Sequence, residues 1–107
     1  NTSKGAVINF TRALAAEWGK YSINVNAICP GLVDTERVDF IASALAPEGE
    51  SGAEHRAMMV RHRESIIPLG RIAQGDDIAR LAAFLCSAES DYMTGLSISV
   101  SGGTEMN

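Results

Sequence analysis

Residues 1–18 read NTSKGAVINFTRALAAEW, and their apolar side chains repeat with the period of an α-helix. One stripe of the predicted helix, at spacings of i, i+3, i+7 and i+11, is formed by Val7, Phe10, Leu14 and Trp18. Such a stripe must pack against another element. Most of the other apolar residues are alanines, which let a second helix approach closely. We therefore expect a helix covered on two sides, partly by another subunit.

A single cation, Lys4, stands at the head of this helix. In one interpretation it is a solvated first-turn lysine, and Thr2 or Ser3 caps the helix by accepting a backbone N–H. A positive charge at this end opposes the helix dipole, but the cost is too small to exclude that interpretation. In the other interpretation the ammonium serves chemistry, and the choice depends on the rest of the chain.

A strand is predicted at residues 23–29 (INVNAIC), after the helix ends near Gly19 with this glycine as its left-handed C-cap. The segment is short, rich in β-branched and apolar residues, and stops at Pro30, which is typical of a parallel strand buried on both faces. The other good candidate strand is residues 96–100, where apolar residues alternate with serines. Two strands do not make a stable parallel sheet, so we expect the chain to supply part of a larger one.

The loop PGLVDT at residues 30–35 lies just past the carboxyl end of the first strand, at the edge where open α/β sheets bind ligands. Pro30 stiffens the exit from the strand, and Gly31 lets the backbone approach a flat ligand. The N–H groups of the following residues are then expected to be free to donate hydrogen bonds. The alternative is an ordinary strand-to-helix turn in which Asp34 or Thr35 is the N-cap of the next helix.

Residues 36–67 are more charged and less periodic, and proline and glycine residues divide them into two short helical pieces. Ser51 and Glu54 match a capping box for the second piece, which is predicted to run from Ala53 to about Ser65. The basic residues of this piece are expected to form a solvated face: His55, Arg56, Arg61, His62 and Arg63. A weakly packed helical pair beside a ligand loop is the composition expected of a lid.

The segment PLGR at residues 68–71 returns the chain to the body of the protein. Asp76 or Asp77 is then expected to cap a further helix. The apolar face of that helix repeats at i, i+3, i+4 and i+7 and belongs to the core: Ile78, Leu81, Ala82 and Leu85. Gly102 and Gly103 follow the last strand and are interpreted as a flexible chain end.

The composition indicates a folded chain of one domain at most, since 46% of the 107 residues are hydrophobic and 21% are charged. A net charge of -4 argues against a nucleic-acid surface. The 2 cysteines lack C-x-x-C spacing and predict neither a metal site nor a disulfide scaffold. No apolar run approaches the length of about 18 residues that a membrane span needs. A cytoplasmic location is the expectation.

Four stretches together resemble the C-terminal half of a short-chain dehydrogenase/reductase: SKGAV at 3–7, FTRALAAE at 10–17, INVNAICPGLVDT at 23–35 and DYMTG at 91–95. The resemblance covers nearly the whole chain and is weakest at residues 36–67. It implies an α/β fold, the C-terminal part of a Rossmann-like doubly wound parallel sheet that is incomplete on its own. Residues 1–107 are then part of a single dinucleotide-binding domain whose N-terminal half is missing, and residues 36–67 are its substrate lid.

The family carries a Tyr-x-x-x-Lys pair, and the resemblance assigns its catalytic lysine to Lys4. The tyrosine then belongs immediately before Asn1. Tyr21 and Tyr92 do not replace it, because neither has a lysine four residues later. A neighbouring lysine lowers the pKa of a phenol from its usual value of about 10, so that the phenolate can accept a proton as a hydride leaves a carbinol. The same ammonium holds ribose hydroxyls of the cofactor.

The resemblance also implies NAD or NADP as cofactor, bound by Lys4 together with Pro30, Gly31, Leu32, Val33 and Thr35. The main chain at Val33 is expected to pair with the nicotinamide carboxamide, with the Thr35 hydroxyl nearby. The implied substrates are polyols, sugars or small hydroxyketones, followed by 3-oxoacyl thioesters, and the implied assembly is a homodimer or homotetramer. Because the Gly-rich turn, the catalytic serine and the structural asparagine of the family would lie upstream, residues 1–107 alone are predicted to be inactive.

The alternative is a non-catalytic interaction or oligomerisation module derived from the same fold. It explains the missing tyrosine, but it does not explain why Lys4 and the cofactor loop both remain, and it leaves a parallel strand without partners. A helix-turn-helix DNA-binding protein is a weaker alternative because the net charge of the chain is negative. If the chain is soluble and folds cooperatively, the module interpretation is favoured. If it aggregates or forms a molten species, the chain is better interpreted as part of a longer enzyme.

Overall fold

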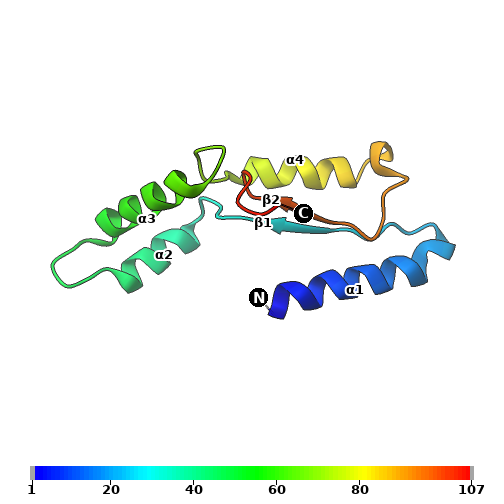
Figure 1. The fold of residues 1–107 in the computed structure, drawn as a ribbon, viewed down its shortest axis with the longest axis horizontal. Coiled ribbons are helices and arrows are strands. Elements are labelled where there is room, and N and C mark those ends of the chain that lie inside the picture. Colours follow the sequence, from blue (N-terminus) through cyan, green and yellow to red (C-terminus); the bar gives the residue numbers. More distant parts are fainter. Residues whose placement is uncertain (1, 107) are drawn as a thin grey trace.

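The computed structural model describes residues 2–106 and combines helices with a short parallel sheet (Figure 1). In chain order its helices and strands are α1 (Thr2–Trp18), β1 (Ala27–Pro30), α2 (Glu36–Leu45), α3 (Gly52–Ile66), α4 (Gly75–Leu85) and β2 (Ser97–Val100). Short 3₁₀ turns follow α1 and α4, at Gly19–Tyr21 and Ala88–Ser90. This order of elements confirms the predicted α/β class.

The strands β1 and β2 are parallel neighbours, with Ala27 opposite Ser97 and Pro30 opposite Val100. Both α1 and α4 contact β1, and in Figure 1 they lie on opposite sides of the strand pair. Helices on both faces of parallel strands are the arrangement of a doubly wound sheet. Most residues of the two strands are only partly buried, because a pair of strands leaves sheet edges and faces uncovered.

The strand β1 is shorter than the predicted strand at residues 23–29, since its ladder begins at Ala27. The residues before it are held by side-chain amides and by a backbone bond from the Gly95 N–H to the Val25 carbonyl at 2.7 Å. Asn24 Nδ2 donates to the Met93 carbonyl at 2.9 Å, and Asn26 Nδ2 donates to the same carbonyl at 3.0 Å. These bonds fasten the segment to the loop before β2, so regular strand pairing starts only after them.

The side of α1 that faces the strands is not the predicted apolar stripe. The buried residues of α1 are Thr11 and Ala15, whereas Val7 and Phe10 are 54% and 65% exposed. A Cβ on Gly95 would lie 3.4 Å from the Ala15 Cβ, so the small side chain lets α1 approach the chain closely just before β2. Within residues 2–106, the predicted stripe is therefore only partly turned toward the strands, since Phe10 faces outward whereas Leu14 is half-buried.

The turn after α1 also differs from the prediction in one respect. α1 ends at Trp18, where the sequence predicts its end. The left-handed residue is Ser22, with a φ of 60°, and not Gly19. The Ser22 N–H donates to the Gly19 carbonyl at 2.9 Å and closes the 3₁₀ turn, which places the left-handed residue three positions further along.

α2 and α3 form a helical hairpin, here named the α2–α3 arm (residues 36–66), which extends away from the strands (Figure 1). Its buried residues are Val38 and Ala42, while Leu45 at the end of α2 is 63% exposed. The Ser51 Oγ accepts the Glu54 N–H at 3.1 Å, which confirms the Ser51 half of the predicted capping box. The arm thus comprises the two helical pieces expected of residues 36–67.

Gly102 and Gly103 form a fixed turn and not the predicted flexible chain end. Both have positive φ angles, of 65° and 99°. A Cβ on Gly102 would lie 2.7 Å from Ile67 Cγ2, and the Leu69 N–H donates to the Gly102 carbonyl at 3.0 Å. The turn therefore holds the segment by which the α2–α3 arm returns to the sheet.

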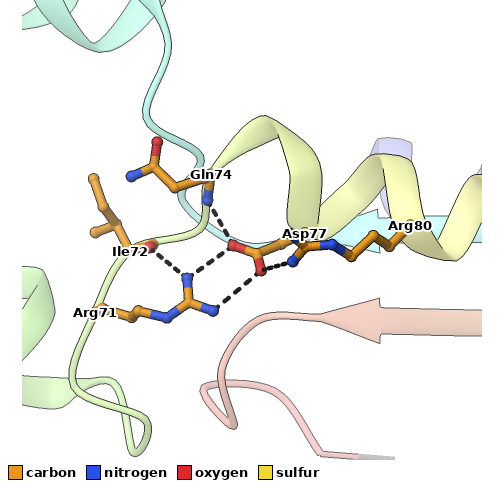
Figure 2. A network of polar contacts seen from close by, with 5 residues as sticks. All are labelled: Arg71, Ile72, Gln74, Asp77 and Arg80. Carbon is orange, nitrogen blue, oxygen red and sulfur yellow. Dashed lines mark hydrogen bonds and ion pairs between the residues drawn. The ribbon is translucent and has the colours of Figure 1, made fainter.

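Asp77 fixes the start of α4 together with Arg71 (Figure 2). Its carboxylate accepts hydrogen bonds from Arg71 Nη1 at 2.8 Å, Arg71 Nη2 at 3.1 Å and the Gln74 N–H at 2.8 Å. Gln74 occupies the N-cap position, where Asp76 or Asp77 was predicted, and Asp77 caps the helix from the third helical position by accepting the Gln74 N–H. The hydrogen bonds from Arg71, followed by that from Gln74, hold the pKa of Asp77 well below its usual range.

Replacing Asp77 by Asn should remove an acid-sensitive contribution to folding. Because the pKa of Asp77 is lower in the folded state than the unfolded value of about 3.9, its carboxylate stabilises the fold at higher pH and loses this effect as the pH falls below about 4. Urea unfolding should therefore show a difference in midpoint between wild type and Asp77→Asn at about pH 7 that narrows at about pH 2.5. Asp76→Asn is the control, and an equal difference at both pH values would contradict the assignment.

Replacing Gly102 by Ala should destabilise the fold by about 1–2 kcal/mol, because alanine is strained at a positive φ and its methyl group would meet Ile67. Thermal unfolding followed by circular dichroism measures the change. Gly75→Ala at the start of α4 is the control, since a Cβ there meets nothing within 4 Å. Equal melting temperatures for Gly102→Ala and the wild type would show that the turn does not hold the return segment.

Candidate active site

Lys4 lies on the first turn of α1, beside the carboxyl end of β1. A hollow of about 390 Å³ opens there, lined by Ser3, Lys4, Val7, Ile28, Cys29, Pro30 and Glu105. The carboxyl edge of parallel strands is where α/β proteins bind ligands. The structure therefore brings Lys4 and Pro30, two of the predicted site residues, to one place.

The Lys4 ammonium forms an ion pair with the Glu105 carboxylate. Hydrogen bonding between the two groups raises the pKa of Lys4 and lowers the pKa of Glu105. The side chains are 36% and 52% exposed, so solvent screens the pair. Lys4 is thus held as a cation in the hollow, and Glu105 is a site residue that the sequence reasoning missed.

Glu105 reaches Lys4 through the turn that follows β2. The Ser101 Oγ accepts the Glu105 N–H at 3.1 Å and donates to the Glu105 carbonyl at 3.3 Å. The ion pair joins residues 101 positions apart, and no local pattern around Glu105 signals it. Only the parallel pairing of the two strands brings the end of β2 to the edge where Lys4 lies.

Gly31, at the start of the predicted cofactor loop, lies close to the second strand. Its N–H donates to the Val100 carbonyl at 2.9 Å, and a Cβ on Gly31 would lie 3.1 Å from Ser101 Cα. Glycine is required here because two backbones approach closely, which is a different reason from the approach of a ligand. The backbone N–H of Gly31 is used by the sheet.

Residues 32–34 make a further parallel bridge, centred on Val33 and Ala73. The Leu32 carbonyl accepts the Ala73 N–H at 2.9 Å, and the Asp34 N–H donates to the Ala73 carbonyl at 2.8 Å. The prediction that the loop N–H groups are free is therefore wrong for Asp34. Because successive residues of an extended segment direct their backbone groups to alternate sides, the N–H and C=O of Val33 point away from Ala73.

The other predicted loop residues lie in different surroundings. Leu32 lines a separate cavity of about 150 Å³ with Ile67 and other residues of the return segment. Thr35 is exposed and occupies the N-cap position of α2, where its hydroxyl makes no capping bond. The lining of the Lys4 hollow therefore includes Pro30 but none of Gly31, Leu32, Val33 and Thr35.

Arg56 on α3 contacts the loop, although the basic residues of this helix were expected to form a solvated face. Its guanidinium forms ion pairs with Asp34 in the loop and with Asp39 on α2, and its side chain is only 28% exposed. The His55 side chain is also turned inward and is 14% exposed. The basic residues of α3 that are exposed as expected are Arg61 and His62. A contact between residues 34 and 56 leaves no sequence signal, because it depends on how the hairpin folds back.

The two tyrosines lie away from the Lys4 hollow, since Tyr21 is 65% exposed, Tyr92 is fully exposed, and neither lines it. The hollow thus contains the Lys4–Glu105 ion pair and neither tyrosine.

Among residues 2–106 no group of three or more His, Cys, Asp and Glu side chains could hold a metal ion, and Cys29 and Cys86 form no disulfide. No helix in this described part of the chain is long and apolar enough to cross a membrane.

Known proteins similar to this chain are redox enzymes. The family profile described as enoyl-(acyl carrier protein) reductase matches residues 1–105. Galactitol 2-dehydrogenase of Agrobacterium fabrum is 41% identical over 106 residues, which are 98% of this chain and 40% of that protein. The short-chain reductase protein NovJ of Streptomyces niveus is 40% identical over 102 residues, covering 95% of this chain and 36% of NovJ.

Solved structures of related proteins share the fold of this chain, and the chain again matches about two-fifths of each of them. A short-chain dehydrogenase family protein from Francisella tularensis superposes with a TM-score of 0.84 at 40% identity, covering 96% of this chain and 41% of that one. L-sorbose reductase from Gluconobacter frateurii, complexed with NADPH and L-sorbose, gives a TM-score of 0.87 at 29% identity and covers 100% of this chain and 40% of that one.

The chain spans about two-fifths of the length of these relatives. The matched part contains the Lys4 helix, the loop after β1 and the β1–β2 pair. Because one family profile covers residues 1–105 and the structural neighbours share the parallel α/β fold, the chain belongs to the short-chain dehydrogenase/reductase family.

Proposed function

We propose that this chain is part of an NAD(P)-dependent oxidoreductase that interconverts a secondary alcohol and a ketone. The observation that carries the proposal is the position of Lys4, a cation in a hollow at the carboxyl edge of parallel strands. The names of the relatives support the redox class, since galactitol 2-dehydrogenase and L-sorbose reductase both act on sugar-like alcohols or ketones. The cofactor is NAD or NADP.

Lys4 is proposed to activate the group that accepts the proton. A phenol with a pKa of about 10 is a poor base at neutral pH, and a cation one helical turn away stabilises its phenolate. We assign that phenol to a tyrosine directly upstream of residue 1, as the Tyr-x-x-x-Lys pattern of the family requires. Glu105 raises the pKa of Lys4 and so helps to keep its ammonium charged. The bound nicotinamide supplies hydride transfer to or from the carbinol carbon.

Lys4 and the loop after β1 suit the nicotinamide end of such a cofactor. The Lys4 ammonium can donate to ribose hydroxyls in exchange for its bond to Glu105. The N–H and C=O of Val33 face away from Ala73 and suit a carboxamide, which offers both a donor and an acceptor. The Thr35 hydroxyl is not used to cap α2 and can also hydrogen-bond to the carboxamide. Pro30 ends β1, and Gly31 continues the chain into this loop close beside Ser101.

Polyols, sugars or small hydroxyketones are the proposed substrates, in keeping with the names of the two relatives. A 3-oxoacyl thioester is the second choice, in keeping with the acyl-carrier description of the family profile. We propose that residues 36–67 act as the substrate lid. The exposed part of the α1 stripe, in which Val7 and Phe10 are more than half exposed, supports a homodimer or homotetramer that covers it.

Replacing Lys4 by Met in the native-length protein, the product of the whole encoding gene, should lower kcat/KM by about 100-fold or more, because the base and the ribose both lose their cation. Rates are measured with galactitol and NAD⁺ and with L-sorbose and NADPH, and cofactor affinity by NADH and NADPH fluorescence. Lys20→Met, on the turn after α1, is the matched control and should keep wild-type values. A wild-type protein that binds neither NADH nor NADPH would contradict the proposal and favour the non-catalytic module.

Residues 1–107 produced alone should show no turnover in either assay. Within residues 2–106 no strand leads through a Gly-rich turn into a helix that could hold the adenosine diphosphate. The native-length protein assayed at the same concentration is the control. Measurable oxidation of galactitol by the 107-residue polypeptide would show that these residues suffice for catalysis.

A further inference from the structure

The α2–α3 arm is built as one unit. α2 and α3 contact each other along the hairpin. Gly52, at the start of α3, lies so close to α2 that a Cβ added to it would overlap the Ser43 side chain. Two helices packed this closely are displaced together, and their placement depends on the base of the hairpin.

That base consists of two chain segments, residues 31–35 leaving the sheet and residues 67–74 returning to it. The Val33–Ala73 bridge joins the two segments. The return segment is held in turn by Gly102, which accepts the Leu69 N–H. The return segment is thus anchored to the end of β2, and the outgoing segment is fixed to the arm by side-chain contacts.

Arg56 on α3 makes that contact. Its Nη2 pairs with Asp34 Oδ1 in the outgoing segment, and its Nε lies 2.5 Å from Asp39 Oδ1 on α2. The Asp34 side chain is 36% exposed and the Asp39 side chain 61%, so the pair with Asp34 is better shielded from solvent. One guanidinium therefore joins both helices of the arm to the loop.

Asp34 is held at two points as a result. Its backbone N–H donates to the Ala73 carbonyl at 2.8 Å, and its carboxylate is paired with Arg56. Asp34 stands between Val33 and Thr35, the residues proposed to meet the nicotinamide carboxamide. A residue fixed through both its main chain and its side chain restricts the peptide groups on either side of it.

We infer that Arg56 is a positioning residue for the cofactor loop: by holding the Asp34 carboxylate it fixes the Val33 main chain and the Thr35 hydroxyl, and it ties the α2–α3 arm to them. The inference rests on the proposed function, since it takes Val33 and Thr35 as cofactor contacts. Arg56 acts through Asp34 and is assigned no contact with the reacting atoms. Arginine suits this position because its planar fork can meet two carboxylates at once, whereas a lysine ammonium is a point charge.

The test compares Arg56→Gln, Arg56→Lys and Arg61→Gln in the native-length protein. Arg61 lies exposed on the same helix, so Arg61→Gln removes the same charge without touching the loop. Variants that keep the wild-type circular dichroism are titrated with NADH and NADPH, and kcat and KM are measured with galactitol and NAD⁺. Arg56→Gln should raise the cofactor dissociation constant about 10-fold with little change in kcat, and Arg56→Lys should lie between it and the wild type. Arg61→Gln should match the wild type.

Asp34→Asn should weaken cofactor binding as Arg56→Gln does, and the double variant should bind no more weakly than either single one, because both changes break the same contact. If Arg56→Gln does not fold, the affinity of Asp34→Asn alone tests the inference. A folded Arg56→Gln protein with wild-type affinity, or additive losses in the double variant, would overturn the inference and leave the proposed function standing. A wild-type protein without affinity for NADH and NADPH would instead overturn the proposed function, and the inference with it.

Discussion

The parallel pairing of β1 with β2 is the constraint on which the other contacts depend. Parallel strands cannot be joined by a tight turn, so the chain between them must make one long crossover that carries α2, α3 and α4. The same pairing brings the carboxyl ends of both strands to one edge. At that edge lie Pro30 from the first strand and, just past the second, the turn that carries Glu105 to Lys4.

Three ion pairs then connect segments that are distant along the chain or that lead into different elements. Each joins a cation to a carboxylate supplied by another segment: Lys4 with Glu105, Arg56 with Asp34, and Arg71 with Asp77. The Asp77 carboxylate is the most shielded of the three and contributes to folding near neutral pH, whereas the Lys4–Glu105 and Arg56–Asp34 pairs are more open to solvent and add little to overall stability. Their effect is on orientation, since they fix where the lysine helix, the arm and the start of α4 lie relative to the strands.

The sequence predicts the elements of this fold well because their causes are local. Apolar periodicity and caps mark the four helices, and two short β-branched or alternating runs mark the parallel strands. The errors arise where a distant partner overrides a local preference. The side-chain amides of Asn24 and Asn26 replace the first part of the predicted strand, and the buried face of α1 is set by the close approach near Gly95. At the candidate site, Lys4 and Pro30 line one hollow, whereas Glu105 and Arg56 arrive through tertiary contacts that no local pattern reveals.

The α2–α3 arm has a consequence for the order in which the chain folds. Its two helices are neighbours in sequence, are joined by a short loop and pack against each other. The hairpin can therefore form early from local encounters. The strands differ, because Leu96 meets Asn26 across 70 positions and this contact must wait for the whole crossover to be in place. The arm therefore shortens the effective loop that the strands must close, and a chain in which it forms slowly would leave the apolar strand residues exposed to aggregation for longer.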